Sequence, residues 1–287
     1  ILNSFYAPLD GPVGKEMCKI AQRNGLSESE GEFARFMTIM KLNASDCQPP
    51  MNDGSGPDES LAHRKALFSI MCVAAHSCAP NALWSVLDRS GARIMKCTAH
   101  IAKGEEIFIS YLDEGVHLTW AKEKRQAFMK DRWGFDCGCV RCQAAEDNAR
   151  AFPCRNGCPG YFHPLRDGTS GRCQTCGAVC PSDEFSRMLK VEQKLAADIE
   201  YIDNVIESGE PIDITQKLQA LKPVHPRHYL TCSLYGLKRE LCANRRQLRA
   251  EAESMDVVIK CKQGITGDYN RGVAFNMQRN ADVWMDA

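Results

Sequence analysis

Apolar residues recur every three or four positions over two long stretches of this chain, a spacing typical of amphipathic helices. The first stretch covers 14–43. The second begins at Ser182 with an acidic pair, a signal of a helix start, and continues to about residue 262. It carries two apolar stripes, which consist of Phe185, Met188, Leu189, Leu195, Ile199, Ile202 and Ile206 and then of Leu230, Leu234, Leu237 and Leu241. These stripes predict antiparallel helix pairs, arranged like a short tetratricopeptide-type solenoid.

The middle of the chain has the pattern of short β-strands. Leu83–Leu87 and Ile94–Ala99 flank the turn sequence Asp88–Gly91, which predicts a hairpin. Further on, Glu106–Leu112 is apolar enough to form a buried strand. Before these segments, 46–59 contains three prolines and two glycines, which predicts a loop. The chain is therefore predicted to belong to the α+β class.

Charge and hydropathy exclude several classes of protein. The chain has 36 basic and 36 acidic residues, so it lacks the overall positive charge typical of nonspecific nucleic-acid binders. The longest apolar run, Ala66–Ala75, is too short to cross a bilayer, so we expect no membrane association. No charged and then apolar leader opens the sequence. We therefore expect an intracellular protein, in the cytoplasm, the nucleus or both.

The sequence contains sixteen cysteines, and eight of them lie within the 44 residues from Cys137 to Cys180. Their close CxC and CxxC spacing in a long chain indicates metal binding more than a disulfide framework. One group supplies the four thiolates of a structural zinc ribbon: Cys154, Cys158, Cys173 and Cys176. A second group supplies only three: Cys137, Cys139 and Cys142. The alternative is that these are reduced, buried cysteines that pack as small apolar side chains. Whether Cys180 or His163 also binds at the ribbon stays open.

Three segments together resemble one known family. Residues 75–81 (AHSCAPN) resemble the Asn-His-Ser-Cys-x-Pro-Asn signature of SET domains, and 104–111 (GEEIFISY) resemble the second SET signature. Residues 135–142 (FDCGCVRC) resemble the post-SET segment that follows the domain. Because a helical region follows, the sequence is most similar to the SET-and-MYND type of protein-lysine methyltransferase. The resemblance covers 66–142, and more loosely 14–46 and 183–262.

The resemblance implies an order of domains. The expected architecture is a partial SET-type β-fold with inserted helices, followed by a post-SET zinc segment, a zinc ribbon and an all-α domain of helical hairpins. The boundaries we expect are 1–46 for the inserted helical part, 47–60 for a loop, 61–115 for the C-terminal SET core, 116–145 for the post-SET zinc segment, 146–182 for the zinc ribbon and 183–287 for the helical domain.

The resemblance also implies a reaction, the transfer of a methyl group from S-adenosylmethionine to a lysine of a histone or another protein. It assigns Tyr111 as the catalytic residue and Phe108 to the substrate channel. It assigns three residues to the cofactor: Asn43, His76 through its backbone, and Phe135 as the aromatic that stacks on adenine. It further implies that Cys78 completes the zinc site of Cys137, Cys139 and Cys142. Two zinc ions are expected in all, together with protein partners at the helical domain.

Two departures from the family pattern bear on activity. Ala75 replaces the signature asparagine and loses an amide hydrogen bond to the cofactor, at a cost of ~1 kcal/mol. No Gly-x-Gly segment with a preceding basic residue occurs before residue 60, and no MYND zinc cluster occurs, so we expect that the chain begins inside the SET domain. The first alternative is therefore a non-catalytic, zinc-stabilised interaction module. A second alternative, a nucleic-acid-binding ribbon that uses Arg150, Arg155, Arg166 and Arg172, is disfavoured by the neutral net charge.

Overall fold

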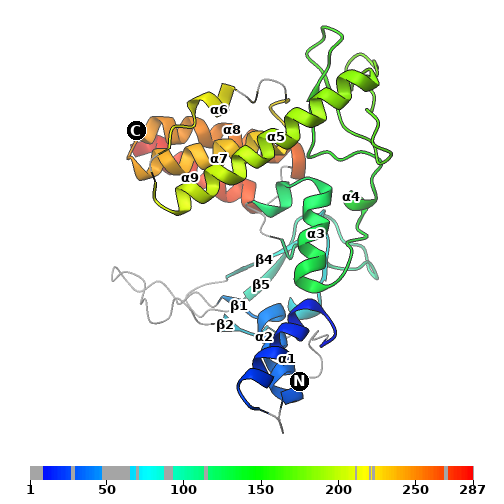
Figure 1. Ribbon diagram of the computed structural model, residues 1–287, viewed down its shortest axis with the longest axis vertical. Coiled ribbons are helices and arrows are strands. Elements are labelled where there is room, and N and C mark those ends of the chain that lie inside the picture. Colours follow the sequence, from blue (N-terminus) through cyan, green and yellow to red (C-terminus); the bar gives the residue numbers. More distant parts are fainter. Residues whose placement is uncertain are drawn as a thin grey trace. The chain divides into compact units, whose positions relative to one another are not determined.

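The computed structural model describes residues 9–26, 30–46, 65–68, 71–86, 93–112, 116–210, 212–219, 221, 224–267 and 271–286. The chain divides into two compact units, Ile1–Tyr111 with Glu123–Val140 and Leu112–Lys122 with Arg141–Ala287. Both helices and strands occur, as the α+β prediction requires (Figure 1). The loop predicted at 47–60 and the hairpin turn predicted at 88–91 lie outside the described residues. The domain boundaries inferred from the resemblance stay predictions.

The first unit opens with two helices, α1 (Pro12–Arg23) and α2 (Glu30–Asn43), which pack against each other (Figure 1). Pro12 at the first helical position favours this start because its fixed φ suits a helix and its missing N–H is not needed there. Val13, Met17 and Ala34 are buried between the helices. Not every apolar residue of α2 is buried, however, since the side chain of Phe36 is 46% exposed.

The strands of the first unit are short and form two-stranded sheets. They are β1 (Ser45–Asp46) paired with β2 (Lys65–Ala66), β3 (Ala75–His76) paired in parallel with β6 (Phe108–Ile109), and β4 (Ala82–Val86) paired antiparallel with β5 (Arg93–Cys97). The register of β4 and β5, from Ala82↔Cys97 to Val86↔Arg93, agrees with the predicted hairpin. A short 3-10 helix, η3 (Met71–Val73), precedes β3.

The strand predicted at Glu106–Leu112 is shorter than expected. Only Phe108 and Ile109 pair with a neighbour, because the partner strand β3 is itself two residues long. The side chain of Asn81 supports this pairing: its Nδ2 donates to the carbonyl of Glu106 at 2.9 Å, and its Oδ1 accepts from the N–H of Phe108 at 2.8 Å. As a result, the two segments that resemble SET signatures lie side by side.

Two helices lie between His117 and Trp133. Thr119 ends a 3-10 helix, η4 (His117–Thr119), and the α-helix α3 covers Lys122–Trp133. Thr119 is therefore not the N-cap of α3, since its hydroxyl donates to the carbonyl of Val116 at 2.7 Å. The four-residue helix α4 (Val140–Gln143) follows and contains the last cysteine of the CxCxxC group.

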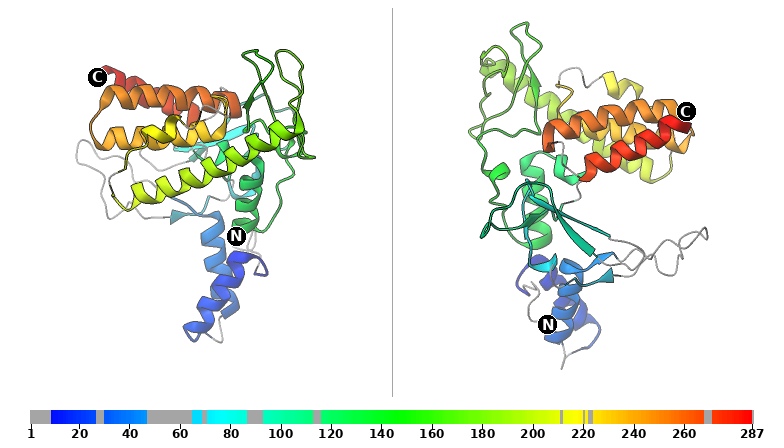
Figure 2. Two further views of the ribbon diagram at one scale, coloured as in Figure 1. Left: turned by 45° about the horizontal axis from the view of Figure 1, so that its top comes forward. Right: turned by 180° about the vertical axis from the view of Figure 1, so that it is seen from behind.

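The second unit joins a ribbon to a set of helices. The ribbon strands are β7 (Phe152–Pro153) and β8 (Tyr161–Phe162), and the helices are α5 (Ser182–Glu207), α6 (Thr215–Gln219), α7 (Tyr229–Asn244), α8 (Leu248–Thr266) and α9 (Arg271–Asp286). Helices α7, α8 and α9 lie side by side, and α5 packs on α7 (Figure 2). Helices α5 and α7 contain the two apolar stripes, which confirms the prediction of helices there. The likeness to tetratricopeptide repeats stays a prediction. Among the described helices, none combines the length and the apolar character needed to span a membrane.

The ribbon and the helices share one hydrophobic core. Phe152 and Phe162 of the ribbon are fully buried in the same cluster as Phe185 and Met188 of α5 and Leu234 of α7. The rings of Phe152 and Phe162 stack at 5.9 Å between centroids, and the ring of Phe152 meets that of Phe185 edge-on at 5.7 Å. The ribbon therefore depends on the helices for its burial and has no separate core among the described residues.

A charged group interrupts the apolar stripe of α5. The buried carboxylate of Glu192 accepts two hydrogen bonds from Arg150, at 2.8 and 2.5 Å, and lies 3.1 Å from Nε2 of the fully buried His228. His228 also caps α7, because its Nδ1 accepts from the N–H of Leu230 at 3.2 Å. Burial lowers the pKa of His228. Burial alone would raise the pKa of Glu192, but the hydrogen bonds from His228 and Arg150 outweigh it and lower that pKa.

We expect Glu192→Gln to destabilise the second unit by about 2 kcal/mol, because it removes the charge that pairs with a buried arginine. Glu200→Gln on the exposed face of the same helix is the matched control and should cost much less. Urea unfolding at pH 7 measures both free energies. Equal costs for the two variants would contradict a stabilising role of the ion pair.

The same network should make the second unit sensitive to acid. A histidine with a lowered pKa contributes stability above about pH 6.5, its ordinary pKa, and that stability is lost as the pH falls towards the folded pKa. Glu192, whose pKa is also lowered, adds a loss below its ordinary pKa of about 4.3. We therefore expect the free energy of unfolding to fall steadily between pH 7 and pH 4. A flat profile over this range would contradict the assignment.

Candidate active site and metal centres

Tyr111 lies just after β6, and the β3–β6 pairing brings it against the first signature segment. Its backbone N–H donates to Nδ1 of His76 at 3.0 Å, and its hydroxyl donates to the carbonyl of Ala74 at 2.8 Å. The ring of Tyr111 lies 5.3 Å from that of His76 and 5.5 Å from that of Trp133. Tyr111 is therefore held both at its backbone and at its hydroxyl, as a residue that positions a reacting atom must be.

His76 is buried and lies at the centre of this group of residues. Burial, as the largest cause, lowers the pKa of His76 to about 4, so the ring is neutral near pH 7. Its ring lies 6.3 Å from that of the half-buried Phe135. Three predicted site residues, His76, Tyr111 and Phe135, are thus brought together. Trp133 was not predicted, and its signal in the sequence is only its place two residues before Phe135.

The remaining two predicted residues, Phe108 and Asn43, lie in β6 and at the end of α2. Phe108 is half-buried in β6, opposite Ala75. Asn43 is the last residue of α2, and its Nδ2 donates to the carbonyl of Ile39 at 3.1 Å. The thiol of Cys72 in η3 donates to the carbonyl of Asn43 at 3.4 Å, so the end of α2 lies against the segment that leads into β3. Roles for Phe108 and Asn43 at a cofactor or substrate stay predictions.

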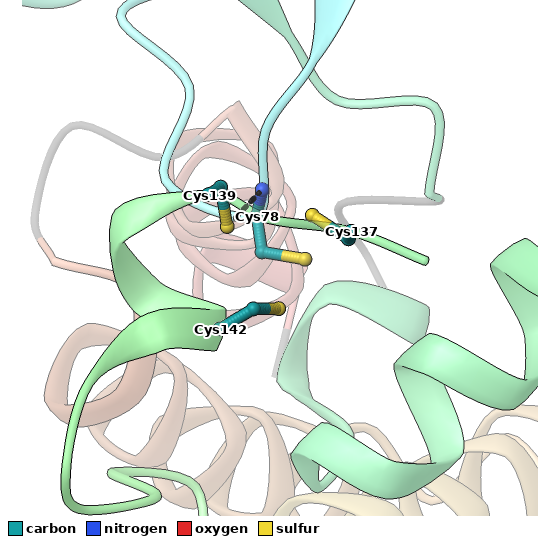
Figure 3. Close-up of side chains that lie close together, drawn as sticks. All are labelled: Cys78, Cys137, Cys139 and Cys142. Atoms are coloured by element: carbon teal, nitrogen blue, oxygen red, sulfur yellow. Dashed lines mark hydrogen bonds between the residues drawn. The ribbon is translucent and has the colours of Figure 1, made fainter. Parts of the chain in front are cut away.

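The first cysteine set consists of Cys78, Cys137, Cys139 and Cys142, whose sulfurs all lie within 4.8 Å of one another. Their side chains gather around one point, although Cys78 comes from a different segment than the other three (Figure 3). The backbone N–H of Cys78 donates to Sγ of Cys139 at 3.4 Å. The structure therefore supplies the fourth ligand that the resemblance implied. Cys78, Cys137 and Cys142 are buried, as in structural metal sites that are closed to solvent.

The second cysteine set consists of Cys154, Cys158, Cys173 and Cys176, also with all sulfurs within 4.8 Å. Backbone N–H groups two residues further on donate to three of the sulfurs, each at 3.4 Å. For Cys173, hydrogen bonds from the N–H groups of Cys176 and then Thr175 stabilise the thiolate and help lower its pKa to about 6. Gly160 is required at its turn, because a Cβ there would lie 2.6 Å from Sγ of Cys173.

Both sets fit zinc by the chemistry of their donors. Four thiolates at ~2.3 Å from one ion lie about 3.8 Å apart, which agrees with sulfurs no more than 4.8 Å apart. Cys180 and His163 are not in the ribbon set. Cys180 packs in the core with Phe162, and Nδ1 of His163 lies 3.2 Å from the carbonyl of Arg150. The ribbon therefore uses the four cysteines that its spacing predicted.

We expect the wild-type chain to bind two zinc ions, one in each set. The Cys154→Ser variant should bind only one, because three thiolates and a hydroxyl bind the ion far more weakly than four thiolates do. Metal analysis of dialysed protein by mass spectrometry measures the ratio. Cys180→Ala is the matched control and should retain two ions. A wild-type ratio of one that Cys154→Ser leaves unchanged would remove the ribbon site.

Comparison with known proteins agrees with this geometry. Residues 18–112 match the SET domain family. The chain carries a SET domain. Relatives include the SET domain-containing protein SmydA-8, isoform B, of Drosophila melanogaster, 34% identical over 131 residues, and the histone-lysine N-methyltransferase SMYD3 of Mus musculus, 31% identical over 83 residues. The N-lysine methyltransferase SMYD2 of Homo sapiens is 33% identical over 112 residues. Two of these three relatives are lysine methyltransferases by name.

The matches cover part of each protein. They span 43%, 29% and 38% of this chain and 28%, 18% and 24% of the three relatives, in the same order. The chain therefore corresponds to less than a third of each of these relatives. Within the SET domain, His76 and Tyr111 lie inside the matched residues, whereas Phe135 and seven of the eight metal-site cysteines lie beyond them.

Proposed function

We propose that this chain is part of an S-adenosylmethionine-dependent enzyme that methylates lysine side chains of proteins. The observation that carries the proposal is the contact between the two SET signatures, in which His76 of the first binds the backbone of Tyr111 in the second. The lysine methyltransferases among the relatives support the same reaction class. The substrate, whether a histone or another protein, is part of the proposal.

The residues present fit one end of the cofactor and not all of it. Phe135 and His76 offer an aromatic face and a backbone edge of the kind that binds adenine. At position 75, alanine offers no side-chain amide for the methionyl part. When bound, S-adenosylmethionine would supply a methyl group on a positively charged sulfur; a neutral amine would attack the methyl carbon in line, and S-adenosylhomocysteine would leave with the electron pair of the broken C–S bond.

The work left to this chain is positioning and proton control. The hydroxyl of Tyr111, held by the carbonyl of Ala74, would align the incoming amine. A substrate lysine must react as the neutral amine, and burial in a channel lined by Phe108 would lower the pKa of its ammonium group. The aromatic rings of Tyr111 and Trp133 offer faces on which a lysine head group gains cation–π stabilisation before it loses its proton.

Two zinc centres would stabilise the structure of the chain. We propose that the first set fixes the post-SET segment to the SET signature through Cys78, and that the second set folds the ribbon. Eight reduced thiolates persist only in a reducing compartment, which supports an intracellular location in the cytoplasm or nucleus. Fractionation of cells that express a tagged chain tests this, and recovery from the medium would contradict it.

The non-catalytic alternative is favoured by the alanine at position 75. It predicts the same two zinc ions and a helical surface that binds proteins, but no methyl transfer. The nucleic-acid alternative is weakened by the ribbon arginines, each of which has a protein partner. Arg150 pairs with Glu192 and Arg155 with Glu184, and Arg166 and Arg172 donate to Gln143 and to the carbonyl of Gly177.

The test of the proposed function is methyl transfer by the full-length protein. The protein is incubated with S-adenosylmethionine that carries a tritiated methyl group and with a mixture of histones and other soluble proteins. Label recovered as methylated lysine after hydrolysis supports the proposal. Substrate proteins with chemically acetylated lysines are the control and should take up none. If no substrate yields labelled lysine, the enzymatic hypothesis is contradicted, and the non-catalytic interaction module becomes the favoured function.

A further inference from the structure

The side chain of His76 lies between the first cysteine set and Tyr111. Its Nδ1 is 3.0 Å from the backbone nitrogen of Tyr111, and its Nε2 is 3.4 Å from Sγ of Cys78. His76 and Cys78 are two residues apart at the end of β3, where the N–H of Ser77 donates to the carbonyl of Ile109 and holds the segment in place at 2.9 Å. One imidazole ring therefore spans the distance between a metal ligand and the proposed catalytic segment.

The tautomer of this ring follows from its partners. A backbone N–H can only donate, so Nδ1 of His76 accepts and carries no proton. The neutral ring then carries its proton on Nε2, the atom that faces Cys78. A metal-bound thiolate is an acceptor, so Nε2 donates to the sulfur of Cys78 whenever the first set is loaded. Both ring nitrogens are then satisfied in a site where His76 is only 8% exposed.

We propose that His76 is a positioning residue that couples metal binding at the first cysteine set to the placement of Tyr111. The inference rests on the proposed function only for the importance of Tyr111. Outer hydrogen bonds to metal ligands orient them and strengthen binding. Without the metal, the sulfur of Cys78 is no longer held in place together with the other three sulfurs of the set, so the ring loses the partner that fixes its orientation. The backbone N–H of Tyr111 then loses its acceptor in a buried site.

Two variants separate the two hydrogen bonds. His76→Phe keeps the ring shape and removes both bonds. His76→Asn keeps a short amide that reaches the Tyr111 N–H but not the sulfur of Cys78. Both variants are compared with the wild-type protein. All three proteins are loaded with cadmium-113, and their tyrosines are labelled with nitrogen-15. The second cysteine set serves as the internal control for metal binding, and Tyr201 on α5 serves as the control amide.

We expect His76→Phe to shift one of the two cadmium signals and to weaken metal binding at that set by about 10- to 100-fold in competition with a chelator. Hydrogen exchange of the Tyr111 amide should accelerate by about 10-fold, with no change at Tyr201. His76→Asn should weaken metal binding equally but leave the Tyr111 amide nearly as protected as in the wild type. The asparagine variant tests the bond to sulfur even if the phenylalanine variant does not fold.

Cadmium signals that His76→Phe and His76→Asn leave unchanged, or a Tyr111 amide that exchanges at the wild-type rate in His76→Phe, would overturn the inference. A loss of methyl transfer without either change would mean that His76 serves the cofactor through its backbone alone, and the proposed function would stand. If both changes occur and no form of the protein transfers methyl groups, the coupling holds and the proposed function fails.

Discussion

Tyr111→Phe in the full-length protein is expected to lower the turnover of methyl transfer at least ~100-fold while the fold and the binding of S-adenosylmethionine are retained. The hydroxyl donates to the carbonyl of Ala74, and the ring is held between His76 and Trp133, so the variant keeps the ring and its packing. What it loses is the oxygen that aligns the amine in the transition state, a contribution of ~3 kcal/mol or more. Turnover is measured with tritiated cofactor, and cofactor binding by calorimetry.

The matched control is Tyr201→Phe. This tyrosine is 66% exposed on α5 and takes no part in the proposed site, so its variant should keep the wild-type rate. A Tyr111→Phe protein that methylates lysine at a near-normal rate would refute the catalytic assignment. A variant that no longer binds the cofactor would show that the hydroxyl supports the pocket instead of the transition state.

Removal of zinc is expected to lower the melting temperature by more than ~10 °C, because a structural zinc ion bound by four thiolates contributes several kcal/mol to folding. In the second unit the effect should extend beyond the ribbon. Phe152 and Phe162 belong to the core of α5 and α7, so loss of the ribbon also removes apolar burial from the helices. Calorimetry before and after treatment with a zinc-selective chelator measures the shift.

Two variants check this expectation. Cys97→Ser, at an exposed cysteine outside both sets, should melt and respond to chelation as the wild type does. Cys154→Ser should already melt at a lower temperature, and chelation should lower it further through the first set. A wild-type melting temperature that the chelator leaves unchanged would mean that both sets act as packed, metal-free thiols.

The sequence determined those features that depend on neighbours in the chain. The stripe from Phe185 to Ile206 predicts α5 because helical period and burial are local properties. The ribbon cysteines predict a metal set because pairs three or four positions apart remain close in a compact turn. The signature segments predicted the SET domain by resemblance. The same resemblance, and no spacing, identified Cys78 as the fourth ligand of the first set.

Only the tertiary structure decided how distant segments meet. The β3–β6 pair is two residues long and has no periodic pattern, so the contact of His76 with Tyr111, and of its ring with Cys78, is not visible in the sequence. The ion pair of Glu192 likewise breaks the stripe of α5 without a local reason. A buried charge is stable only where a partner of opposite charge lies next to it with the right geometry. Here the partner, Arg150, comes from another segment, so the pair depends on the whole fold.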